Sequence, residues 1–113
     1  MSRRVVVTGV GLVCGLGIGT DEVWKNLLAG KSGIRTITQF DASAFDCTIA
    51  GEVRDFDPLH WAEKKEIKKI ARFIQLALAS TDFAMRMSEL KITPDIAEAT
   101  AARSQTDTIN ALE

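Results

Sequence analysis

The first apolar stretch of the chain is a short run of β-branched residues followed by glycines. Val5, Val6 and Val7 stand together before Thr8, with no alternation of polar and apolar positions. Such a continuous run is typical of a strand that is covered on both faces, as in an α/β sheet. We therefore predict a buried strand over residues 4–8. Glycines recur from there to Gly19, which predicts a loop.

A short helix is predicted after this loop, over residues 20–30. Thr20 can cap its start, and acidic residues follow in the first turn, where they favour the positive end of the helix dipole. Gly30 is a natural left-handed residue at its end. One face of this helix is apolar and carries Val23, Trp24, Leu27 and Leu28. Residues 31–54 lack helical spacing, so we predict short strands and loops there.

The longest predicted element is a helix over about residues 62–90. Two apolar rows follow it at helical spacing. The first row is Ile67, Ile70, Ala71, Ile74, Ala77, Leu78, Thr81, Ala84, Met85 and Ser88, and the second is Phe73, Leu76, Ser80, Phe83 and Met87. A helix that is apolar on two sides is expected to lie buried between layers. Its first turns are instead strongly cationic, and we call these residues the basic cluster: Lys64, Lys65, Lys68, Lys69 and Arg72.

The predicted strand and helix both need partners that the sequence does not supply. A single strand cannot satisfy its own backbone groups, and no further strand is predicted in residues 97–113. We therefore expect an incomplete α/β fold that is poorly stable alone. A sharp, cooperative thermal transition of the purified monomer would contradict this expectation.

Composition narrows the classes of function. The 113 residues leave room for one small domain, and the formal charge of −1 argues against a surface made to bind nucleic acid. Cys14, Cys47 and His60 are too few for a tetrahedral zinc site, and no disulfide framework or cofactor is indicated. Nothing approaches the roughly 18 apolar residues of a membrane span. Glycines interrupt the apolar start in a way that a secretory signal would not. We expect a cytoplasmic location.

The glycine loop also invites a Rossmann-type nucleotide-binding interpretation. The usual G-x-G-x-x-G spacing from Gly9 needs a glycine where Cys14 stands, although a looser spacing fits through Gly15. Four residues then intervene before the helix, and the acidic ribose ligand would have to be Asp41, with no clear strand before it. Close packing of backbone against backbone is the favoured interpretation, and nucleotide binding stays an alternative.

Several strings in register carry a resemblance to a known family. They are R-R-V-V-V-T-G-V-G from Arg3, T-D-E-V-W-K-N-L-L-A-G-K-S-G-I from Thr20, F-D at Phe40, A-G-E-V from Ala50, D-F-D from Asp55, K-E and K-K around Lys65 and Lys68, and F-I-Q from Phe73. Together they resemble the opening of the elongating β-ketoacyl-acyl-carrier-protein synthases. The agreement covers residues 3–95, so residues 1–95 are interpreted as the N-terminal part of that family's N-terminal domain. Residues 96–113 are interpreted as a non-family tail, disordered or helical.

This resemblance implies a partial thiolase-like fold, the N-terminal part of a layered αβαβα architecture that is normally a homodimer. It implies decarboxylative Claisen condensation of an acyl thioester with a malonyl carrier protein, in fatty acid elongation. The family's Cys-His-His set lies beyond position 113, so neither Cys14, Cys47 nor His60 is assigned a catalytic role. His60 is expected to be a surface residue. We expect a chain that is inactive alone, whether it is a truncation, a frameshift product or an incomplete gene.

One functional feature of the family maps onto this chain. The resemblance implies that Lys65, Lys68 and Lys69, with Arg72 beside them, belong to the docking surface for the acidic acyl carrier protein. On the residues alone, a solvated helix face explains the same charges. A non-catalytic module that binds the carrier protein is the second hypothesis. The chain departs from the family at Ala71, where an aspartate is usual.

Overall fold

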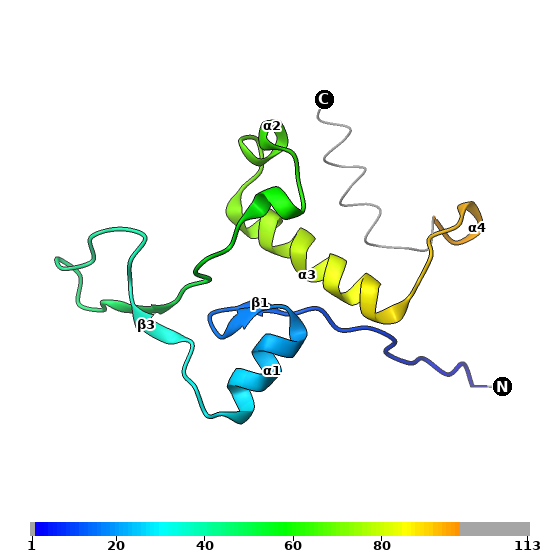
Figure 1. The fold of residues 1–113 in the computed structure, drawn as a ribbon, viewed down its shortest axis with the longest axis horizontal. Coiled ribbons are helices and arrows are strands. Elements are labelled where there is room, and N and C mark those ends of the chain that lie inside the picture. The colour runs from blue at the N-terminus through cyan, green and yellow to red at the C-terminus, as the bar shows by residue number, and fades with distance from the viewer. Residues whose placement is uncertain (1, 98–113) are drawn as a thin grey trace.

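The structure, a computed structural model, describes residues 2–97. Short strands, three α-helices and a final helical turn alternate along the chain. In order they are β1 (Val13–Cys14), β2 (Gly17–Ile18), α1 (Thr20–Leu28), β3 (Ile34–Thr36), β4 (Ile49–Gly51), the 3-10 helix η1 (Pro58–His60), α2 (Lys64–Ile67), α3 (Arg72–Ser88) and α4 (Pro94–Ala97). Figure 1 shows α3 in the middle, with α1 and α2 on opposite sides of it and the β3–β4 hairpin projecting away.

The strands form two separate antiparallel pairs. In the first pair, β1 and β2 make a tight hairpin in which Val13 lies opposite Ile18. In the second, β3 and β4 pair so that Arg35 lies opposite Ala50. The residues described thus contain both α and β elements, as the α/β prediction requires, but each sheet has only two strands.

The predicted strand at residues 4–8 does not form. Residues 2–12 have no strand, and Val5, Val6 and Val7 are 93%, 67% and 82% exposed. Figure 1 shows this segment as an extended trace that passes the C-terminal half of α3. A strand exists only where a neighbour accepts and donates its backbone hydrogen bonds, and none of the strands between residues 2 and 97 lies beside it. The prediction of a formed strand was therefore wrong for this chain.

The helix predicted at 20–30 is confirmed, with small changes at its ends. Gly19, at φ 102°, caps α1 in place of Thr20, whose hydroxyl donates instead to the carbonyl oxygen of Val10 at 2.7 Å. Gly30 has the expected left-handed conformation, at φ 66°. The apolar face is only partly covered, because Val23 is buried whereas Leu28 is 71% exposed.

The helix predicted at 62–90 is confirmed only from residue 72 onward. Its first part contains only the four-residue helix α2 and a connection, because Glu63 and Ala71 both adopt extended backbone with ψ near 150°. The side chain of Gln75 then binds the carbonyl oxygens that a continuous helix would have used internally, at Ile67 (3.3 Å) and Ile70 (3.2 Å). Periodicity alone could not reveal this break, since the apolar spacing continues through it.

The core is small. Among residues 2–97, those that are buried are Gly19, Val23, Ala42, Phe56, Gln75 and Ala79. The two-sided burial predicted for the long helix is not realised, because Phe73 is 72% exposed and Met87 is 49% exposed. The apolar surface of α3 is therefore covered on one side only.

The glycine loop lies directly against α3. A Cβ atom added at Gly9 would overlap the carbonyl oxygen of Ala84, and one added at Gly11 would overlap that of Ser80. Backbone thus packs on backbone here, as the favoured interpretation of these glycines predicts. The Cβ side of Gly9 and of Gly11 is therefore occupied by α3.

Candidate functional site

The basic cluster is spread over two helices and the connection between them. Lys64 and Lys65 lie in α2, Lys68 caps the end of α2, and Arg72 begins α3. All members of the cluster are exposed, including Lys69 in the connection. The structure therefore keeps the predicted residues together at the surface, although they do not share one continuous helix. Figure 1 shows α2 standing off the N-terminal end of α3.

The position of α2 depends on contacts at both of its ends. The Glu66 side chain accepts from the backbone N–H of Glu63 at 3.4 Å, which is one half of a capping box. After α2, Gln75 is 9% exposed and donates to Ile67 and Ile70 from α3. A four-residue helix cannot persist without such support, because isolated helices of fewer than about 12 residues are marginal in water.

Arg72 differs from the lysines of the cluster, because its guanidinium is used within the chain. Its Nη2 donates to the carbonyl oxygen of Val53 at 2.9 Å. Its Cζ lies 5.7 Å from the centre of the Phe56 ring, and Phe56 is 8% exposed. No pattern in the sequence indicates this contact, because the two residues are separated by the whole of α2.

The other residues considered as candidates lie apart from the cluster. Cys14 is half-buried in β1, and Cys47 is exposed, with its Sγ 3.4 Å from the carbonyl oxygen of Ile49. His60 is exposed in η1, which confirms its prediction as a surface residue, and its ring meets the ring of Trp61 edge-on. Within residues 2–97, no three His, Cys, Asp or Glu side chains gather in a group that could hold a metal ion.

A carboxylate anchors the hairpin. Glu52 accepts hydrogen bonds from the backbone N–H of Thr38 (2.9 Å), from the Thr38 hydroxyl (2.9 Å) and from the backbone N–H of Gln39 (3.1 Å). Arg54 lies 3.4 Å from the same carboxylate and donates to the carbonyl oxygen of Thr36 at 2.6 Å. These contacts, led by the Thr38 backbone N–H, lower the pKa of Glu52 from its ordinary value. Glu52 thereby orders the start of the loop between β3 and β4.

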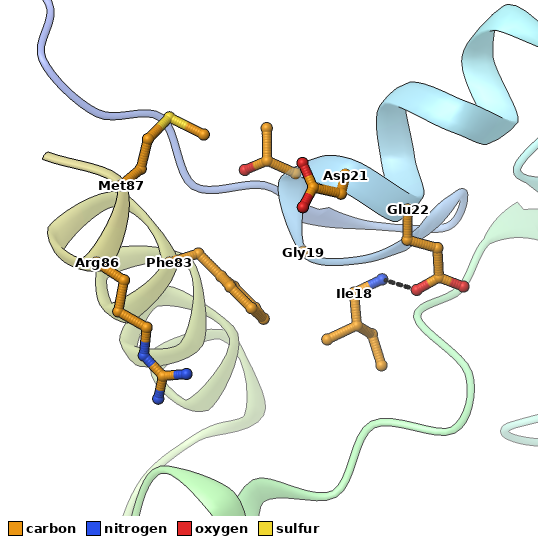
Figure 2. A pocket seen from close by; sticks show the side chains of 8 residues that line it. Ile18, Gly19, Asp21, Glu22, Phe83, Arg86 and Met87 are labelled. Carbon is orange, nitrogen blue, oxygen red and sulfur yellow. Dashed lines mark hydrogen bonds between the residues drawn. The ribbon is translucent and has the colours of Figure 1, made fainter.

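A cavity of about 520 Å³ lies between the start of α1 and the C-terminal half of α3. Figure 2 shows the ring of Phe83 on one side of it and Ile18 and Gly19 on the other. Two of its charged lining residues make contacts within the chain: Glu22 accepts from the N–H of Ile18 at 2.9 Å, and Arg86 pairs with Asp82 at 2.8 Å. The cavity contains no residue of the basic cluster.

The sequence matches the family model described as the beta-ketoacyl synthase N-terminal domain over residues 2–107. The chain belongs to the beta-ketoacyl synthase family. The fold is correspondingly the N-terminal part of the thiolase-like α/β architecture, as predicted. Among residues 2–97, no helix combines the length and the apolar character needed to cross a bilayer.

Individual relatives agree with this assignment. The 3-oxoacyl-[acyl-carrier-protein] synthase 2 of Coxiella burnetii is 50% identical over 90 residues, which are 80% of this chain and 22% of the relative. The enzyme of the same name from Vibrio harveyi is 43% identical over 93 residues, 82% of this chain and 22% of the relative. A solved ishigamide ketosynthase/chain length factor superposes with a TM-score of 0.68 at 37% identity, over 79% of this chain and 22% of that structure. The chain thus spans about a fifth of the length of the ketosynthases it matches.

Proposed function

We propose that this chain forms the carrier-protein docking part of a 3-oxoacyl-acyl-carrier-protein synthase in fatty acid elongation. The observation that carries the proposal is the exposed basic cluster, which combines Lys65, Lys68 and Lys69 at the surface of a ketosynthase-family fold. Acyl carrier proteins are acidic, and opposite charges at the rim of an interface speed encounter and fix orientation more than they add affinity. A docking event that must be fast and reversible suits such a surface.

We also propose that the 113 residues do not catalyse condensation alone. The reaction implied by the family uses one cysteine and two histidines, whereas the chain has a single histidine, His60. His60 is exposed in η1, and the cysteines lie elsewhere, in β1 and in the β3–β4 loop. A non-catalytic carrier-binding module would use the same cluster. The homodimer implied by the resemblance and the cytoplasmic location expected from the sequence stay predictions.

Binding of a fluorescently labelled acyl carrier protein tests the docking proposal. We expect the chain to bind the carrier, and we expect the triple variant Lys65→Glu, Lys68→Glu, Lys69→Glu to bind at least about tenfold more weakly with a flatter salt dependence. The matched control changes three exposed cations elsewhere: Arg4→Glu, Lys25→Glu and Lys91→Glu. It makes the same change in net charge, so equal binding by both variants would refute the proposal.

An activity assay tests the proposal that the 113 residues do not catalyse condensation alone. The chain is incubated with an acyl thioester and malonyl carrier protein, and the 3-oxoacyl product is measured by mass spectrometry. We expect none. Formation of that product by the chain alone would contradict the proposal.

A further inference from the structure

The guanidinium of Arg72 lies at one end of a stacked pair of aromatic rings. It lies over the Phe56 ring, and Phe56 lies against Trp61 with ring centres 5.2 Å apart and an interplanar angle of 4°. Arg72 also donates to the carbonyl oxygen of Val53. The start of α3 is therefore joined to residues 53–61, the segment that leads into α2.

The far end of the stack is fastened to the middle of α3. The indole Nε1 of Trp61 donates to Asp82 at 3.0 Å, and its ring meets Phe83 at 5.9 Å between centres. Asp82 is held in turn by Arg86 at 2.8 Å. Arg72 and Asp82 are ten residues apart on one helix, or about 15 Å along its axis. The segment before α2 is thus held at two separate points of α3.

The contacts of Phe56 and Trp61 with α3 determine the position of the lysines in the basic cluster. Between Trp61 and Arg72 the chain contains only α2 and its connections, and α2 is too short to hold its own shape. The stack fixes the chain before α2, and Gln75 fixes the chain after it. Lys65 and Lys68 are therefore presented by a segment held at both ends, and Arg72 provides one of these attachments.

We propose that Arg72 is a positioning residue for carrier docking: it acts through its planar guanidinium, by holding the Phe56–Trp61 stack, and not as a charge that meets the carrier. This rests on the proposed docking function. A lysine carries the same charge but lacks the planar fork of donors, and it cannot reproduce the directional bond to Val53 and the contact with Phe56 in the same geometry. One conservative substitution therefore separates the charge of Arg72 from the directed contacts of its guanidinium.

The experiment compares Arg72→Lys with the wild-type chain in carrier binding and in the NMR signal of the Trp61 indole N–H. The chain has two tryptophans, so Trp24→Phe assigns the signals. We expect Arg72→Lys to bind about fivefold more weakly, with an unchanged salt dependence and a shifted Trp61 signal. Arg35→Lys, at an exposed residue of β3, is the matched control and should alter neither.

A second variant shows whether weaker binding by Arg72→Lys reflects a lost contact or a general loss of folding. Phe56→Leu keeps an apolar side chain and the charge of Arg72 but removes the ring, and we expect the same weakening as for Arg72→Lys. Far-UV circular dichroism reports whether α3 persists in each variant.

The outcomes separate the two proposals. Wild-type binding by either Arg72→Lys or Phe56→Leu overturns the positioning role, and so does weakened binding with an unmoved Trp61 signal, which would indicate direct contact between Arg72 and the carrier. A wild-type chain that does not bind the carrier removes the docking proposal and this one with it.

Discussion

Ala71, the position at which the resemblance implies an aspartate, is the N-cap residue of α3. Its backbone is extended, at φ −67° and ψ 153°, and no side chain caps the helix. Aspartate is among the preferred N-cap residues because its carboxylate accepts from the backbone N–H groups of the first turn. We therefore predict that Ala71→Asp stabilises α3.

The magnitude follows from the geometry of the cap. Replacing alanine by an N-cap acceptor stabilises a helix by about 0.5–2 kcal/mol. Ala71 is exposed, so the new carboxylate would not be desolvated, and it could accept from the backbone N–H of Phe73. Negative charge at the positive end of the dipole adds about 0.3–1 kcal/mol at low salt. The cap alone should slow amide exchange in the first turns of α3 by about 2- to 30-fold.

Hydrogen exchange measured by NMR is the appropriate assay, because it gives a local free energy without requiring a cooperative global transition. Ala71→Asn separates the hydrogen bond from the charge, and Ala71→Leu changes size without adding an acceptor. We expect slower exchange for the aspartate and asparagine variants and no slowing for leucine. Equal exchange in all three variants and the wild type would refute the assignment of Ala71 as a missing cap.

Two further predictions concern the glycine loop and the hairpin. Gly11→Ala should force the loop away from α3 at a cost of about 1–3 kcal/mol, which would make amide exchange around Ser80 about 5- to 150-fold faster. The control Gly51→Ala meets only an ordinary 3.6 Å contact with Ile34 and should leave that exchange rate unchanged. Equal exchange rates in the two variants would show that Gly11 does not pack tightly against α3. Because the folded-state pKa of Glu52 is lowered, its contribution to stability is present above its unfolded pKa and is lost as pH falls through the folded one. The amide signals of Thr38 and Gln39 should therefore titrate with a midpoint below the ordinary glutamate value, and Glu52→Gln should abolish that titration; a midpoint at or above the ordinary value would contradict the structure.

The local pattern of the sequence determined the elements that need few distant partners. Asp21 and Glu22 at the start and Gly30 after the end marked α1, because capping and dipole effects act within one turn. The apolar spacing also predicted a helix across the whole of α3, although it did not show that the helix begins at Arg72. The basic cluster could be listed from the sequence because surface charge needs no tertiary contact to be recognised.

Tertiary contacts decided the rest. Val5 to Val7 have strong β propensity, yet no strand forms where no partner strand lies beside them, because sheet hydrogen bonds are always made between segments. The break before α3 lies at the extended backbone of Ala71, and Gln75 compensates for it by donating to carbonyl oxygens five and eight residues before it. In the sequence, Arg72 does not differ from the other cations of the basic cluster. Only the folded chain places it over Phe56, because that contact joins residues on either side of α2.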